Sequence, residues 1–108
     1  MATTKATMQF LMEQLSAVEG VRCRPMMGEY LLYVRDTLVG GIYDGRLLVK
    51  DVPQARAFLP DGREVLPYEG AKPMLLVEEV DEPEVLARLL EALYAALPAP
   101  RPKRSAKR

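Results

Sequence analysis

The chain has 108 residues, about half of them apolar, with one cysteine and no histidine or tryptophan. This length fits one domain with its own core. The missing histidine excludes histidine-dependent nucleophilic triads and Cys/His zinc sites, and the single Cys23 closes no intramolecular disulfide. We predict no metal and no cofactor. No signal segment and no membrane-spanning run is apparent, so we expect a cytoplasmic protein with no membrane contact.

The formal net charge of 0 hides a strong asymmetry along the chain. Residues 101–108 hold five of the fifteen Lys and Arg and no acid, so residues 1–100 carry ten bases against fifteen acids. We predict a folded domain over 1–98 and a disordered basic tail over 99–108. Such a basic run is more commonly only a solvated terminus. The more specific interpretation is that it contacts phosphate groups. The candidate nucleic-acid contacts are Arg101, Lys103, Arg104, Lys107 and Arg108.

The first half of the chain predicts a helix and then strands. Residues 5–19 place apolar residues at helical spacing, with Thr4 or Thr7 as the candidate cap and Gly20 as the end. The stripe consists of Met8, Leu11, Met12, Leu15 and Val18. Residues 21–25 predict an edge strand and residues 30–34 the next strand. The stretch RPMMG between them predicts a turn whose methionines fill core space.

An Asp44-Gly45 pair between residues 38–43 and 46–50 predicts a β-hairpin with a two-residue turn. In that register one face is wholly apolar and belongs on the core, and Gly40 on it predicts close packing of a helix. This face carries Leu38, Gly40, Ile42, Leu47 and Val49. The other face is mixed and is predicted to be exposed. It supplies the candidate partner surface: Val39, Tyr43, Arg46, Leu48 and Lys50.

The second half predicts a short helix from Pro53, an irregular connection over 63–73, a strand over 74–77 and a final helix. Asp81 is the expected cap of that helix, and Pro98 ends it. Its apolar stripe consists of Leu86, Leu89, Leu90, Leu93 and Leu97. The element order predicts an α+β fold. Its simplest form is a two-layer sandwich, with an antiparallel sheet and two long helices on one face.

Few residues suggest chemistry. Cys23 lies between Arg22 and Arg24, which would lower the pKa of a nucleophilic thiol. In a strand those cations point to the opposite face, so a small core residue is the favoured interpretation. The acids fall in turns and helix starts, and no glycine pattern forms a phosphate loop. The mixed hairpin face fits an interface and an ordinary solvated surface about equally.

The run RPMMGEYLLYVRDTLVGGIYDGRLLVK, residues 24–50, resembles the TfoX N-terminal domain family. The matching positions are Arg24, Met26, Gly28, Tyr30, Leu32, Tyr33, Gly45, Leu47 and Lys50. The likeness extends over roughly residues 5–97. It implies a fold like that of type III secretion chaperones, a tendency to self-associate, and a role in or near transcriptional regulation of DNA uptake.

Three functions follow in order of preference. The first is a non-enzymatic regulatory or adaptor domain that acts through protein contacts. The second is sequence-independent DNA binding through the tail and the sheet-face cations Arg46 and Lys50. The third, an enzyme that uses only carboxylates, Tyr or Lys, ranks last. We also expect a homodimer, because three apolar residues on one exposed sheet face would form a patch that a second copy covers.

Overall fold

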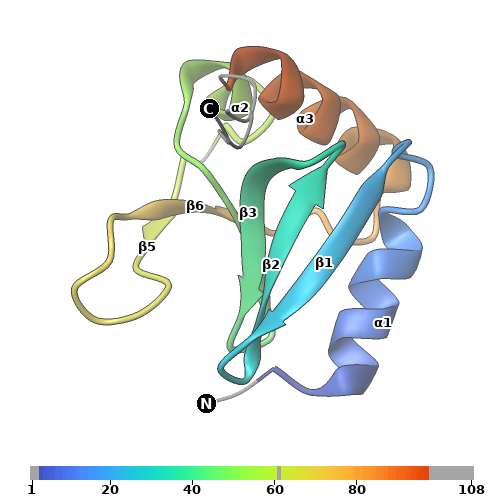
Figure 1. Cartoon of the computed structure of the whole chain (residues 1–108). Helices are drawn as coiled ribbons and strands as arrows, with labels where there is room; N and C mark the ends of the chain where they lie inside the picture. Colours follow the sequence, from blue (N-terminus) through green and yellow to red (C-terminus); the bar gives the residue numbers. More distant parts are fainter. Residues whose placement is uncertain (1–2, 61, 98–108) are drawn as a thin grey trace, which may run out of the picture.

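The computed structural model describes residues 3–60 and 62–97, which form an α+β fold with a six-stranded antiparallel sheet (Figure 1). Its elements are α1 (Lys5–Gln14), β1 (Val21–Met26), β2 (Glu29–Val34), β3 (Thr37–Tyr43), β4 (Arg46–Val49), α2 (Pro53–Arg56), β5 (Glu64–Val65), β6 (Met74–Val77) and α3 (Pro83–Ala96). The strand order is β1-β2-β3-β4-β6-β5. The α+β prediction is confirmed. The short strand β5 lies in the connection that the sequence predicted to be irregular.

Three consecutive two-residue turns join the first four strands. The central residues all have positive φ, as a type I′ hairpin turn requires: Met27 and Gly28, Arg35 and Asp36, and Asp44 and Gly45. The stretch RPMMG is therefore a turn between strands, as predicted. The prediction that its methionines fill core space is wrong, however, because Met27 is 97% exposed at the tip of the turn and Met26 is half-buried outside the core cluster.

The predicted register of the β3–β4 hairpin is confirmed. Gly40 pairs with Val49, Gly41 with Leu48, Ile42 with Leu47, and Tyr43 with Arg46. Leu47 is buried, and it joins the core cluster together with its cross-strand partner Ile42. The Asp-Gly turn was thus sufficient to fix which residues of the two strands face each other.

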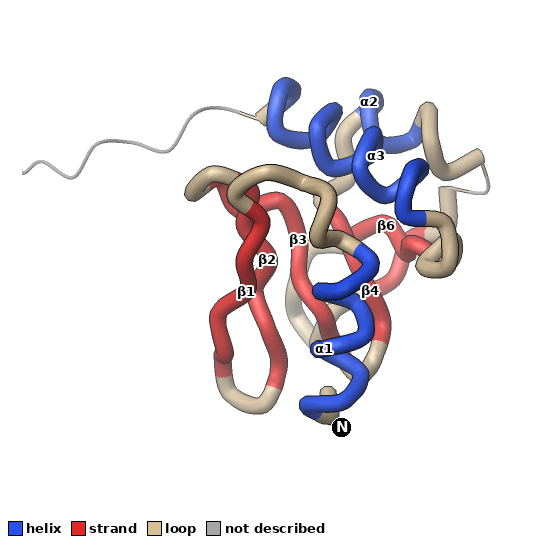
Figure 2. The backbone as a smooth tube through the Cα atoms, turned by 90° about the vertical axis from the view of Figure 1, so that its right-hand side faces the viewer, coloured by secondary structure: helices blue, strands red, loops and turns tan. Residues whose placement is uncertain are grey.

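The sheet and the two longer helices share one hydrophobic core. The helical stripes predicted from the sequence supply buried residues to it: Leu11, Leu15 and Val18 from the first half, and Leu86, Leu89, Leu90 and Leu93 from α3. The strands add Leu32, Val34, Val39, Ile42, Leu47, Val49, Leu75 and Val77. Figures 1 and 2 show α1 running alongside the strands and α3 crossing near their ends.

The helix starts differ in how they are capped. Thr4 caps α1 as predicted, since its hydroxyl accepts a hydrogen bond from the backbone N–H of Thr7 at 3.2 Å. The predicted Asp81 cap of α3 is wrong. The N-cap residue is Glu82, which makes no side-chain capping bond, and Pro83 occupies the first turn. Proline is suited to that position because its missing N–H has no partner there.

The N-terminal segment ties two of the hairpin turns together. The carboxylate oxygen Oε1 of Glu29 accepts hydrogen bonds from the Thr3 hydroxyl at 2.6 Å and from the backbone N–H of Asp44 at 3.0 Å. The backbone N–H of Gly45 donates to Thr3 Oγ1 at 3.0 Å, and the N–H of Thr3 donates to the carbonyl of Gly28 at 3.1 Å. The Glu29 carboxylate thus holds the N-terminal segment against the turn at Asp44, because hydrogen bonds to a charged acceptor are strong.

Arg35 links the middle turn to the helices. Its backbone N–H donates to the carbonyl of Gly20 at 3.0 Å, and its guanidinium pairs with Glu91 of α3 at 2.5 Å. The same guanidinium lies 4.1 Å from the ring centroid of Tyr94, in cation–π geometry. These contacts explain how a bulky residue is held at positive φ in this turn.

The Leu47→Ala substitution tests the position of the sheet relative to the core. Because the Leu47 side chain is 1% exposed, we expect its truncation to lower the free energy of unfolding by about 2–5 kcal/mol. Arg46→Ala, one residue away on the other face, should change it by no more than about 0.5 kcal/mol. Urea unfolding followed by circular dichroism measures both. Equal losses in the two variants would contradict this placement.

A cavity on the sheet face opposite the core

A β-bulge in β3 decides which side chains face the core. Between Leu32 and Tyr33 of β2 the register shifts, because Leu32 pairs with Gly40 whereas Tyr33 pairs with Leu38. Val39 is therefore the extra residue, and a bulge of this kind changes the faces on which neighbouring side chains lie. Val39 is 0% exposed and belongs to the core cluster. Leu38 lies instead on the opposite face, where it lines a cavity.

Two predictions about this hairpin are therefore wrong. Val39 is not on an exposed face, and Leu38 is not on the core face, because simple alternation fails at a bulge. Gly40 also does not mark the approach of a helix. A Cβ added at Gly40 would overlap the carbonyl oxygen of Leu48 and lie 2.8 Å from the Cα of Val49, so the close neighbour is the backbone of β4.

The face opposite the core is covered over part of its area by the chain itself. The ring of Tyr43 folds back over Gly41, where an added Cβ would lie 2.5 Å from it. Tyr68, from the connection between β5 and β6, packs on Tyr43 with 6.3 Å between the ring centroids. Tyr43 is 5% exposed and Leu48 0% exposed. The predicted exposed surface is thus buried at these two residues.

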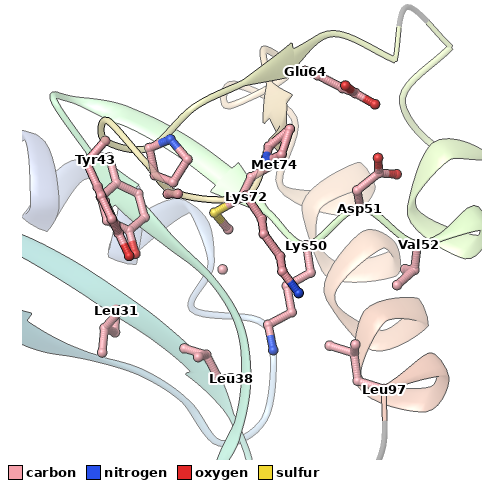
Figure 3. A pocket seen from close by; sticks show the side chains of 15 residues that line it. Leu31, Leu38, Tyr43, Lys50, Asp51, Val52, Glu64, Lys72, Met74 and Leu97 are labelled. Carbon is pink, nitrogen blue, oxygen red and sulfur yellow. The ribbon is translucent and has the colours of Figure 1, made fainter.

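Beside this aromatic pair lies a cavity of about 680 Å³. Leu31 and Leu38 reach it from β2 and β3, Val52 from the segment after β4, Met74 from β6 and Leu97 from the end of α3 (Figure 3). The β5–β6 connection closes one side with its prolines and tyrosine, namely Pro67, Tyr68 and Pro73. A concave site of this volume, lined mostly by apolar groups, is typical of a ligand or side-chain binding pocket.

The acids of the cavity are already paired. Arg56 donates to both carboxylate oxygens of Asp51 at 2.8 Å and to Glu64 at 2.7 Å. The hydrogen bonds from Arg56 hold the pKa of the Asp51 carboxyl below its usual range. One guanidinium thus contacts both carboxylates, offsets part of their charge and also joins α2 to β5. Bidentate geometry of this kind is what a planar guanidinium makes best.

The cations of the cavity are not paired. Within residues 3–60 and 62–97, the side-chain amines of Lys50 and Lys72 make no hydrogen bond and no ion pair. Figure 3 shows both amines in the space between Leu38 and Leu97, whereas Asp51 and Glu64 lie together on another side. The cavity therefore has an acidic side whose carboxylates are hydrogen-bonded to Arg56, and a separate side that holds the two lysine amines. Burial raises the pKa of the Tyr43 phenol, which lines another part of the cavity.

The candidate partner surface predicted from the sequence is divided by the structure. Tyr43 and Lys50 line the cavity, Leu48 lies buried on the same face of the sheet, and Val39 lies in the core. Arg46 is half-buried and its Nε donates to the carbonyl of Tyr43 at 3.4 Å. The predicted tail contacts Arg101, Lys103, Arg104, Lys107 and Arg108, and the predicted tail over 99–108, lie outside the described residues.

Sequence reasoning missed most of the cavity. Leu31, Tyr68, Lys72 and Met74 were not singled out, although the irregular connection predicted over residues 63–73 carries two of them. Cys23 is half-buried, and burial raises rather than lowers the pKa of its thiol. This direction fits the interpretation as a structural residue and not as an activated nucleophile.

The architecture defines a small α+β domain whose antiparallel sheet carries an apolar cavity on one face. The chain belongs to the TfoX N-terminal domain family, whose pattern matches residues 13–97. It is also 36% identical over 106 residues to an uncharacterized 12.7 kDa protein from the trpE 5′ region of Spirochaeta aurantia. That alignment covers 97% of this chain and 92% of the relative. Membership of this family fits a regulatory or adaptor role.

Gly40→Ala tests the close approach of the strands at the bulge. Because the added Cβ would meet the backbone of β4 and not a movable side chain, we expect a loss of several kcal/mol or failure to fold. Gly45→Ala is the matched control. Its Cβ would meet nothing within 4 Å, and its cost of about 1 kcal/mol comes from the positive φ alone. Thermal unfolding compares the two, and a Gly40→Ala variant as stable as Gly45→Ala would contradict the proposed packing.

Proposed function

We propose that the protein is a non-enzymatic regulatory or adaptor domain that acts through protein contacts at the cavity-bearing face of its sheet. The observation that carries this proposal is the cavity itself, which presents apolar side chains of β2, β3 and β6 beside an exposed aromatic rim. Tyr68 of that rim is 58% exposed. Concave apolar sites are typical of binding pockets. Aromatic residues are enriched among those that contribute most of the binding energy at protein interfaces.

Family membership supports the finer parts of the proposal. These are a role in or near transcriptional regulation of competence, a cytoplasmic location, and a two-layer fold related to type III secretion chaperones. No helix in the described ranges 3–60 and 62–97 is long and apolar enough to cross a membrane.

Self-association through the same face is part of the proposal. Tyr43 and Leu48, two apolar residues of the predicted partner surface, are unsuitable as probes of a dimer because both are buried within one copy. An acid placed there would disturb the fold itself. Tyr68→Glu is the appropriate probe, since this ring lies at the rim and is more than half exposed. Sedimentation at micromolar concentration should show a dimer for the parent and a monomer for this variant. A monomeric parent would end the dimer proposal.

Partner capture from the host lysate tests the adaptor function. The parent should retain a defined partner after nuclease treatment, and Tyr68→Glu should lose it because a charge then stands at the rim of the cavity. Phe10→Glu is the matched control, since Phe10 is an aromatic residue of α1 that is 42% exposed and does not line the cavity. Retention of the partner by Tyr68→Glu, or its loss with Phe10→Glu, would place the contact elsewhere.

Sequence-independent DNA binding is the second candidate. It is favoured by the five cations of residues 101–108 and by the amine of Lys50, which pairs with no acid among residues 3–60 and 62–97. The net charge of −5 over residues 1–100 opposes it, because an acidic body repels nucleic acid at long range. If DNA is the partner, the chain should be retained on duplex DNA in a salt-dependent manner, and removal of residues 99–108 should abolish retention. Retention that survives this truncation would exclude the tail as the contact.

A further inference from the structure

The charge distribution of the cavity indicates what class of ligand fits it. Its floor is apolar and is built by side chains from three strands, Leu31, Leu38 and Met74. Its volume of about 680 Å³ lies within the range of roughly 300–1,000 Å³ that is usual for sites that enclose a small organic molecule. An occupant must therefore have a substantial apolar body.

The occupant must also compensate positive charge. Arg56 already satisfies Asp51 and Glu64, so these two acids are not available to a cationic ligand. In the described part of the chain, no acid is paired with Lys50 or Lys72. Both amines lie at the open side of the same apolar floor (Figure 3). An anionic group at that position would gain charge-assisted hydrogen bonds.

This distribution disfavours two other occupants. The segment that follows Leu97 is basic and would bring further cations to a side that already holds two lysines. Duplex DNA offers phosphates but no apolar body that would enter the cavity between Leu38 and Met74. A small ligand that combines an apolar body with one anionic end satisfies both features of the site.

The geometry points to a binding site for a small amphiphilic carboxylate, whose apolar chain or ring system lies on Leu31, Leu38 and Met74 and whose carboxylate binds the amines of Lys50 and Lys72. This inference rests on the proposed function in one respect: the ligand occupies the cavity of the face that contacts the partner, and it regulates that contact.

Decanoate is the probe for this site, used below the concentration at which it forms micelles. Isothermal titration calorimetry should show saturable binding of decanoate, and weaker binding of decyltrimethylammonium, which has the same chain length and the opposite charge. The Lys50→Met/Lys72→Met variant keeps the apolar stems and removes both cations. Its affinity for decanoate should fall about tenfold or more, because it loses charge-assisted hydrogen bonds.

Lys5→Met is the matched control, since Lys5 is an exposed lysine of α1 that does not line the cavity. This variant should bind decanoate as the parent does. Amide chemical shifts give the location: decanoate should shift Gly40, Tyr43 and Ala71, and it should leave α1 unchanged. Circular dichroism confirms that each variant is folded.

Several results would overturn the inference. These are no saturable binding of decanoate, equal binding of decyltrimethylammonium, unchanged affinity in the double variant, or shifts confined to other elements. The outcome is separable from that of partner capture. If decanoate does not bind but Tyr68-dependent partner capture is intact, the ligand inference is wrong and the adaptor proposal stands. If decanoate binds but no partner is captured, the adaptor proposal is wrong and the ligand site stands.

Discussion

The extra residue in β3 is the constraint on which the arrangement of the sheet depends. With regular alternation, Leu38 would point into the core and Val39 away from it. The bulge opposite Leu32 and Tyr33 exchanges these positions, so the core gains the smaller β-branched side chain and the other face gains a leucine. Next to the bulge β4 approaches β3 closely, and a Cβ at Gly40 would overlap the carbonyl oxygen of Leu48. A single backbone irregularity thus builds part of the core and part of the cavity floor.

The sequence predicted those features that depend on neighbours a few residues apart. The Asp44-Gly45 turn determined the pairing of two strands, because positive φ at both positions leaves little freedom in the loop. The helical spacing predicted for residues 5–19 and for α3 identified residues that are buried, although α1 ends at Gln14 and Leu15 and Val18 follow it. A local rule sufficed in each case.

Features that depend on distant segments were not predictable in this way. The bulge at Val39 results from the pairing of β3 with both β2 and β4, and no single residue signals it. The burial of Tyr43 depends on Tyr68, which lies in a connection with no apolar period. The cavity shares this cause, because its walls come from segments that only the tertiary fold brings together. The alternation of side chains along the hairpin therefore placed Lys50 on the candidate partner surface. It gave no indication that Lys72 lines the same cavity.

The pairing pattern also has a consequence for the order in which the molecule assembles and opens. Strands β1 to β4 are joined by two-residue turns, so their contacts join residues that are close in sequence. Forming these contacts therefore costs little loop-closure entropy. Strand β6 pairs with β4 only after residues 50–73 have been closed into a loop. Such late-forming segments open at a lower free energy than the unit on which they dock. The cavity is thus intact only while β6 and the connection before it are docked. Amide hydrogens of β6 should accordingly exchange faster than those of β3, and each such opening would empty the site without unfolding the four-stranded meander.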